Sequence, residues 1–237
     1  MESILELKNV CFTYPRSSKG LYNVSVCIPE KQRIAVLGLN GAGKSTLFLT
    51  LCGVLKPKSG EYYIDGKQFK FTKKERLLLG KQIGYVFQDP EVQLFAVTVY
   101  DDIAFGLQNM GVTESEVKQR VEKYMQFLNI THLKDNAPHE LSYGQKKLVA
   151  IAGVLVMEPK VVILDEPFAW LDVVQEENMK SMLEKLSPQG MTIVMSTHNL
   201  DFAKEWADYG IVLNEGECVE EGEMKQLNIE ELIHANH

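Results

Sequence analysis

Long apolar runs are absent from this sequence of 237 residues. The longest uninterrupted stretch, Leu148 to Met157, has ten residues, whereas a helix needs about 20 to cross a bilayer. We therefore predict no transmembrane helix. The first residues, Met1 to Glu6, also lack a basic region followed by an apolar core, so we expect no secretory signal and a cytosolic chain.

Cysteine and positive charge are also scarce. The four cysteines, Cys11, Cys27, Cys52 and Cys218, show no C-x-x-C spacing, which argues against a zinc site or a disulfide framework. Lys and Arg number 25 against 32 Asp and Glu, a net charge of −7. Nucleic-acid binding draws on clustered Lys and Arg, so we expect no nucleic-acid partner, although a basic protein partner fits.

A glycine-rich stretch stands between an apolar run, Arg33 to Leu37, and a helix-like run, Thr46 to Leu55. It matches G-x-x-x-x-G-K-[ST], the pattern of a loop whose amides surround phosphates, and the alternative is a plain strand-to-helix turn. Lys44 is placed to reach the β- and γ-phosphates and Ser45 to offer its hydroxyl to Mg²⁺. The predicted phosphate loop consists of Gly38, Leu39, Asn40, Gly41, Ala42, Gly43, Lys44, Ser45 and Thr46.

Strand-like and helix-like segments alternate along the chain, which favours an α/β fold with a largely parallel sheet. A capping-box pattern at Thr113 to Glu116 predicts the start of one helix. The predicted strands cover 4–12, 21–28, 33–37, 61–64, 83–87, 161–164 and 192–196, with two more near Ile211 and Cys218. The predicted helices cover 46–55, several segments of 89–140, and 142–157, 173–186 and 200–207.

Polar residues follow three of the apolar strands. Asp165 and Glu166 end the run at 161–164, where Asp165 could hold Mg²⁺ and Glu166 could activate water; the alternative is an acidic turn. Gln88 could contact Mg²⁺ or the water, or simply lie on the surface. His198 could sense the γ-phosphate, although a lone His is usually structural. Tyr14, in a turn between two strands, could stack on adenine or pack at a strand end.

The segment Leu141-Ser142-Tyr143-Gly144-Gln145 resembles the signature motif of ATP-binding cassette (ABC) proteins, in which the second glycine varies. The other motifs then follow in the order of that family. They are Tyr14 as aromatic loop, 38–46 as Walker A, Gln88 as Q-loop, 142–145 as signature, 161–166 as Walker B, Leu171-Asp172 as D-loop and His198 as switch histidine.

The resemblance implies one domain, 1–237, with ATP and Mg²⁺ as cofactors. Its fold class is α/β, a P-loop ABC ATPase core with an antiparallel β subdomain (1–88 and 158–237) and an inserted helical subdomain (89–157). It implies catalytic roles for Glu166, His198, Gln88 and Lys44, and Mg²⁺ contacts from Ser45, Gln88 and Asp165. Two such ATPases pack head to tail in the family, so Ser142, Tyr143, Gly144 and Gln145 are expected to act on the partner's nucleotide.

A narrower likeness covers 85–95 and 98–106, which are similar to the Q-loop region of energy-coupling-factor ATPases, especially the cobalt and nickel uptake type. This implies a peripheral protein at the cytoplasmic face of the cell membrane. Its partners would be a second ATPase, identical or different, a transmembrane coupling subunit with basic helices near Asp89 and Glu91, and a substrate-binding membrane subunit. The substrate, a transition metal or a vitamin, is left open.

Four residues depart from the family pattern. Phe168 and Trp170 stand where threonine and glycine or serine are usual, Val173 replaces a common proline, and Leu148 a frequent arginine. Two rival interpretations are a P-loop kinase acting on a small metabolite and an ABC regulatory or repair ATPase. The kinase has no need of a signature acting in trans, and the acidic charge disfavours a DNA partner.

Overall fold

The central element of the fold is a six-stranded sheet. The computed structural model describes residues 2–186 and 190–228, and its sheet runs in the order β10-β9-β3-β8-β7-β6. Strands β9, β3, β8, β7 and β6 pair in parallel, and β10 pairs antiparallel to β9. The strands are β3 (Arg33–Leu37), β6 (Ile83–Val86), β7 (Val161–Leu164), β8 (Thr192–Ser196), β9 (Tyr209–Asn214) and β10 (Glu217–Glu223).

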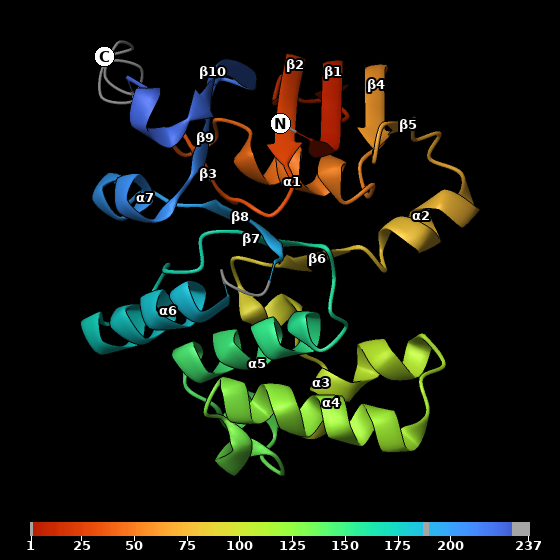
Figure 1. Ribbon diagram of the computed structural model, residues 1–237, viewed down its shortest axis with the longest axis vertical. Coiled ribbons are helices and arrows are strands. Elements are labelled where there is room, and N and C mark those ends of the chain that lie inside the picture. Colours follow the sequence, from red (N-terminus) through yellow and green to blue (C-terminus); the bar gives the residue numbers. More distant parts are fainter. Residues whose placement is uncertain (1, 187–189, 229–237) are drawn as a thin grey trace.

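A smaller antiparallel sheet, in the order β2-β1-β4-β5, lies on one side of the large sheet (Figure 1). Its strands are β1 (Ser3–Thr13), β2 (Gly20–Pro29), β4 (Ser59–Ile64) and β5 (Lys67–Gln68). Helix α1 (Lys44–Leu51) lies between the two sheets (Figure 1). The α/β fold class with an antiparallel sheet and helical elements is therefore confirmed.

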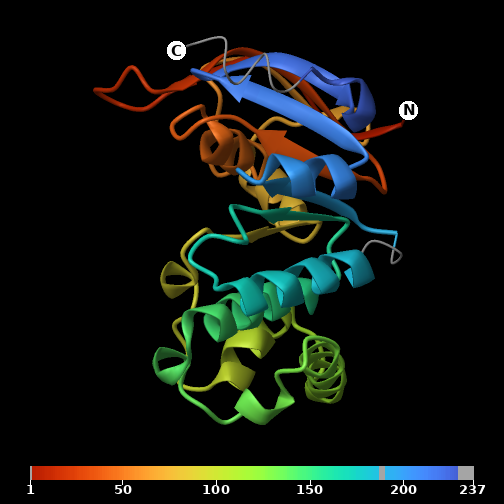
Figure 2. The ribbon, with the colours of Figure 1, turned by 90° about the vertical axis from the view of Figure 1, so that its left-hand side faces the viewer.

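Helices α3 to α7 cover the opposite face of the large sheet, whereas α2 packs through Leu79 into the core that contains α1. Helices α5 and α6 lie directly below the strands, and α3 and α4 form the far end of the molecule (Figures 1 and 2). The helices are α2 (Lys73–Leu79), α3 (Val99–Asn109), α4 (Glu114–Phe127), α5 (Tyr143–Leu155), α6 (Val173–Leu186) and α7 (Leu200–Trp206). No helix within 2–186 and 190–228 is long and apolar enough to span a membrane.

Two hydrophobic cores flank the large sheet, and alternate residues of each strand enter opposite cores. Val161 and Ile163 of β7 pack with α1 and the antiparallel sheet, whereas Val162 and Leu164 pack with α3 to α7. Successive side chains of a strand point to opposite faces, so a strand covered on both faces is apolar throughout. This explains the continuous hydrophobicity of 161–164 and 33–37.

Several local predictions need correction. Helix α1 ends at Leu51, four residues early, and Gly53 follows with a φ of 70°. Thr113 precedes α4 but its side chain makes no capping hydrogen bond. Strand β6 ends at Val86, so Gln88 lies in the following loop. Helix α2, which begins with a capping box between Thr72 and Glu75, was not predicted.

Candidate nucleotide-binding and catalytic site

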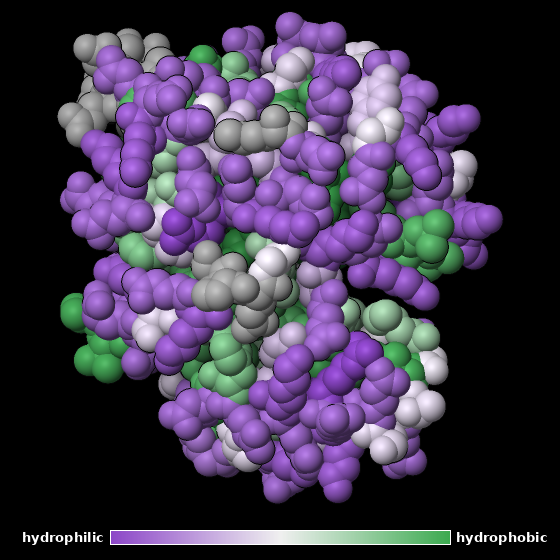
Figure 3. Space-filling model, in the orientation of Figure 1, coloured by the Kyte–Doolittle hydropathy of each residue, from purple (hydrophilic) through white to green (hydrophobic). Residues whose placement is uncertain are grey.

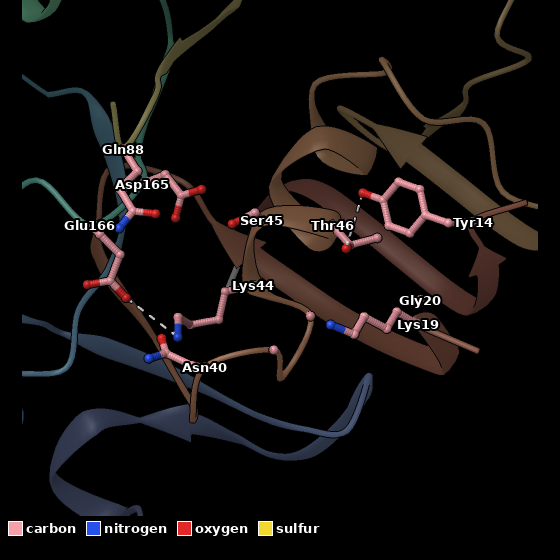
Figure 4. Close-up of a pocket in the computed structure, with 12 residues that line it drawn as sticks. Tyr14, Lys19, Gly20, Asn40, Lys44, Ser45, Thr46, Gln88, Asp165 and Glu166 are labelled. Atoms are coloured by element: carbon pink, nitrogen blue, oxygen red, sulfur yellow. Dashed lines mark hydrogen bonds and ion pairs between the residues drawn. The ribbon is translucent and has the colours of Figure 1, made fainter. Parts of the chain in front are cut away.

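One pocket of about 260 Å³ collects residues from both loops that follow β3 and β7. Because these strands are parallel neighbours of β8, their carboxyl ends open on the same edge of the sheet. Figure 4 shows the phosphate loop facing the acidic side chains across this pocket. The lining residues are Tyr14, Lys19, Gly20, Asn40, Gly41, Gly43, Lys44, Ser45, Thr46, Gln88, Asp165 and Glu166.

Glycine makes the conformation of the phosphate loop accessible. Gly38, Gly41 and Gly43 have φ values of 147°, 84° and 104°, in a region that glycine enters without steric cost. Helix α1 begins directly after Gly43, and the first amides of a helix have no partner within it. The loop and helix start together form an anion-binding concavity.

Lys44 is buried at the floor of this pocket, with 7% of its surface exposed. Its Nζ donates to the carbonyl oxygens of Gly38 at 2.8 Å and Leu39 at 3.3 Å. It also lies 3.5 Å from Oε1 of Glu166, a contact drawn in Figure 4. The amine is therefore fixed between the loop and the strand-end carboxylate.

Asp165 is buried and held by two hydroxyl groups. Tyr85 Oη donates to its Oδ2 at 2.9 Å, and Ser196 Oγ donates to its Oδ1 at 2.7 Å. Burial, and then the charge of Asp165, raise the pKa of Tyr85 well above its usual value. Tyr85 thus stays a hydroxyl donor at neutral pH and keeps the carboxylate in one orientation.

Glu166 faces the phosphate loop from the end of β7. Its Oε1 lies 2.8 Å from Nε2 of His198, in addition to the contact with Lys44. Its own N–H donates to Ser196 Oγ at 2.8 Å. Glu166 has a φ of 46°, a left-handed conformation unusual for a non-glycine residue. His198, half-exposed, reaches the site through Glu166.

The donors around the pocket fit Mg²⁺. Asp165, Gln88 and the hydroxyl of Ser45 offer oxygen atoms in one cavity, and Mg²⁺ prefers oxygen ligands from one or two carboxylates together with substrate phosphates. The described residues contain no cluster of three or more His, Cys, Asp or Glu that would hold an ion alone. Bound with a nucleotide, Mg²⁺ would supply charge neutralisation at the phosphates.

Four further predicted residues have separate positions. Tyr14 reaches the pocket from the turn after β1, with its hydroxyl 3.5 Å from Oγ1 of Thr46. Leu39 is exposed, whereas Ala42 is buried. Asp172 lies at the start of α6, where its Oδ1 accepts the N–H of Gln175 at 2.8 Å. Asp172 therefore has a capping role in this chain.

The signature residues lie outside this pocket, at the start of α5. Ser142 and Gln145 form a capping box, in which each side chain bonds the other's backbone N–H. Tyr143 Oη donates to the carbonyl oxygen of Gln88 at 3.3 Å. A Cβ on Gly144 would meet the side chain of Gln175 at 2.7 Å, so that glycine permits close packing against α6.

Two departures from the family pattern, Trp170 and Phe168, each pack against an aromatic residue of a neighbouring helix. Trp170 has a φ of 60°, is 64% exposed and packs edge-on against Tyr143, with ring centroids 5.3 Å apart. Phe168 packs against Phe202 of α7 at 5.0 Å. The bulky side chains of Tyr143 and Trp170, at positions where glycine is common, therefore pack against each other.

Sequence reasoning missed four residues that organise the site. Ser196 and Tyr85 hold Asp165, and Lys19 and Gly20 line the pocket. Tyr85 lies in the stretch 85–95 that resembles the Q-loop region, but no role was predicted for it, and the other three belong to no predicted motif. Only the position of Ser196, at the carboxyl end of a parallel strand, could have indicated its role.

The fold and the pocket define a P-loop nucleotide-binding protein. A family model described as ABC transporter matches residues 21–169. The chain belongs to this ABC transporter family, and it is an ATPase.

Its relatives are ATP-binding subunits of one group of transporters. It is 44% identical, over 100% of its length and 87% of the relative's, to the energy-coupling factor transporter ATP-binding protein EcfA of Carboxydothermus hydrogenoformans. Identity to the EcfA protein of Methanocaldococcus jannaschii is 41%, over 98% of this chain and 84% of the relative. The resemblance to energy-coupling-factor ATPases is confirmed.

Solved structures agree. The structure of cbiO1 from Clostridium perfringens, described as part of the ABC transporter complex cbiONQ, matches with a TM-score of 0.86 and 41% identity, over 95% of this chain and 90% of that one. A dimeric ATP-binding cassette, MJ0796, bound to ADP and Pi, matches with a TM-score of 0.83 and 28% identity, over 94% and 100% of the two chains.

Proposed function

We propose that this chain binds and hydrolyses ATP with Mg²⁺ to energise an importer for a transition-metal ion, cobalt or nickel, or a vitamin. The observation that carries the proposal is the single pocket shared by the phosphate loop, Gln88, Asp165 and Glu166. Its relatives are named energy-coupling factor transporter subunits, and a neighbour is named as part of a cbiONQ complex.

In the proposed chemistry, Glu166 accepts a proton from the attacking water, because its carboxylate faces the phosphate loop. Lys44 leaves Glu166 for the incoming phosphate and offsets its charge. His198, bound to the same carboxylate oxygen, orients Glu166 toward the water. Asn40, Gly41 and Gly43 contribute backbone around the phosphates.

A second subunit would complete the site. Ser142 is exposed at the start of α5 and lies outside the pocket of its own chain. We therefore propose that Ser142 to Gln145 face the nucleotide of a partner ATPase, consistent with the dimeric state of MJ0796. ATP would close such a dimer and its hydrolysis would reopen it.

The membrane partner would dock on a groove of about 230 Å³ between β6, α3 and α5. Phe95 and Phe105 line this groove with 65% and 44% of their surfaces exposed, and acidic Asp89 and Glu91 come shortly before Gln93, which also lines it. Apolar and acidic surface together fit an amphipathic helix with basic residues, as proposed for the coupling subunit. The chain would thus reside at the cytoplasmic face of the membrane.

Mixing two inactive variants tests the composite site. Ser142→Arg should block the signature and Glu166→Gln the hydrolytic carboxylate, so each variant alone is expected to lose turnover. A mixed dimer would contain one intact site. Random assortment at equal concentrations should therefore restore about one quarter of the wild-type sites. No recovery on mixing, with dimers confirmed by cross-linking, would show that the signature does not act in trans.

The membrane partner is tested separately with Phe95→Asp. This change should abolish co-purification with the membrane subunits and leave ATP hydrolysis by the isolated ATPase unchanged, because Phe95 lies outside the nucleotide pocket. Leu77→Asp, at an exposed site on α2, is the matched control and should still co-purify. Figure 3 shows hydrophobic surface over α2 as well, so the comparison asks which apolar surface the partner covers.

A further inference from the structure

Lys147 of α5 is a buried cation for which the sequence predicted no role. Only 1% of its surface is exposed. Its Nζ donates to three backbone carbonyl oxygens, those of Glu166 at 2.9 Å, Pro167 at 2.9 Å and Ala169 at 3.1 Å. An ammonium group has three N–H donors, so every one has an acceptor in the loop that follows β7.

That loop carries two non-glycine residues in the left-handed conformation, Glu166 with a φ of 46° and Trp170 with a φ of 60°. Such a conformation persists only where surrounding contacts hold it. Ser196 accepts the N–H of Glu166, and Lys147 binds its carbonyl oxygen. The backbone of Glu166 is therefore held on one side from β8 and on the other from α5.

We propose that Lys147 is a positioning residue for ATP hydrolysis, which holds the backbone of Glu166 so that its carboxylate faces the phosphate loop. Lys147 lies outside the nucleotide pocket and acts only through this loop. The inference rests on the proposed role of Glu166. Because the same helix begins at Ser142, Lys147 also links the placement of the signature to the carboxylate of its own chain.

A role in packing alone predicts a different behaviour. Burial opposes the charge of Lys147 and lowers its pKa to about 8, while the charges of Glu166 and Asp165 act against this shift. Methionine has an unbranched side chain of similar length that fills irregular gaps in a core. If Lys147 only filled space, Lys147→Met would leave turnover unchanged.

The test separates binding from turnover. Lys147→Met should lower kcat by about 10- to 100-fold, since small misplacements of a reacting group have effects of this size. The Kd of a non-hydrolysable ATP analogue should change less than about 3-fold, because Lys44 and the phosphate loop are untouched. Lys147→Gln retains two donors and should give an intermediate kcat. It also provides the measurement if the Met variant does not fold.

Lys160→Met is the matched control. Lys160 directly precedes β7, at the opposite end of the strand from Glu166, and makes an exposed ion pair with Asp65. Its kcat should equal that of the wild type. A wild-type kcat in Lys147→Met or Lys147→Gln, or an equal loss in Lys160→Met, would overturn the proposal.

A double-variant cycle shows whether Lys147 acts through Glu166. In a Glu166→Gln background, Lys147→Met should leave the residual rate unchanged, because the carboxylate it positions is already absent. An additional loss of the same factor would refute action through Glu166. If Glu166→Gln alone keeps full turnover, the proposed function fails; if Glu166→Gln is inactive and Lys147→Met is not, this inference alone fails.

Discussion

Two loops that follow buried strands of one sheet reach the pocket in different ways. The loop after β3 takes left-handed conformations at Gly38, Gly41 and Gly43, whereas the loop after β7 takes them at Glu166 and Trp170. A left-handed conformation costs a non-glycine residue about 1 to 2 kcal/mol. The first loop is therefore specified by its own residues, and the second depends on contacts from elsewhere in the chain.

The contacts that hold the second loop come from distant positions. Lys147 of α5 and Ser196 of β8 fix the backbone of Glu166, and Tyr143 packs against Trp170. One loop thus behaves as a self-contained phosphate site. The conformation of the other loop depends on the positions of α5 and β8, which suits a carboxylate whose action we propose to depend on a partner subunit.

The largest expected effect is that of Glu166→Gln. Removing a general base lowers rates by about 10² to 10⁴-fold, and we expect such a loss in phosphate release, with ATP binding retained. Glu205→Gln, at an exposed position on α7, should keep the wild-type rate. Unchanged steady-state hydrolysis by Glu166→Gln would remove this residue from its role and leave the second loop without a catalytic purpose.

The difference between local and distant contacts also explains which features the sequence could predict. Strand β7, helix α6 and strand β8 have the predicted bounds, because each is an apolar or periodic run between turn residues. The phosphate loop was found because its requirement for glycine is local. The signature at 142–145 was recognised by its resemblance to a family motif, and the candidate roles of Asp165 and Glu166 came from their place at the carboxyl end of an apolar strand.

The contacts of the second loop could not be predicted in this way. Lys147 and Glu166 are separated by 19 residues in sequence, and nothing around Lys147 distinguishes it from the adjacent Lys146. Likewise, nothing in the sequence relates the departure Trp170 to Tyr143 of the signature, although their rings are in contact. Similarly, a Cβ on Gly53, just after the end of α1, would lie 2.9 Å from Leu79 of α2, a helix that was not predicted.

Substitutions of two glycines in the loop after β3 test how far that loop depends on contacts with the rest of the chain. A Cβ on Gly38 would lie 2.3 Å from the carbonyl oxygen of Leu213, whereas a Cβ on Gly41 would meet nothing within 4 Å. Gly38→Ala should therefore lower the free energy of unfolding by about 2 kcal/mol or more, from clash and strain. Gly41→Ala should lower it by only about 1 kcal/mol, from its left-handed φ.

Urea denaturation of the nucleotide-free protein measures both changes. Equal losses for Gly38→Ala and Gly41→Ala would mean that backbone conformation alone decides the cost. In that case the close approach of Leu213 to the first loop would have no energetic consequence, and the loop would be even more self-contained than the structure indicates.

The smallest effect is expected at the amino ends of the parallel strands, opposite the pocket. Here Asp208 accepts hydrogen bonds from the Arg33 guanidinium at 2.6 and 3.0 Å and from the backbone N–H of Arg33 at 3.0 Å. Asp208→Asn should reduce stability by about 1 kcal/mol or less, because the pair is partly exposed. ATP turnover should stay at the wild-type rate, since neither residue lines the pocket.

The pH dependence of this loss gives the sign of the interaction. The bonds from Arg33 hold the pKa of Asp208 below its usual value of 3.8, so the folded state binds its proton less tightly than the unfolded state. The stabilisation is therefore complete above about pH 4 and disappears as the pH falls through the lowered pKa. The stability difference between wild type and Asp208→Asn, measured by urea denaturation, should shrink below pH 4. A difference that persists undiminished in acid would mean that Asp208 stabilises the strand ends by its hydrogen-bond geometry and not by its charge.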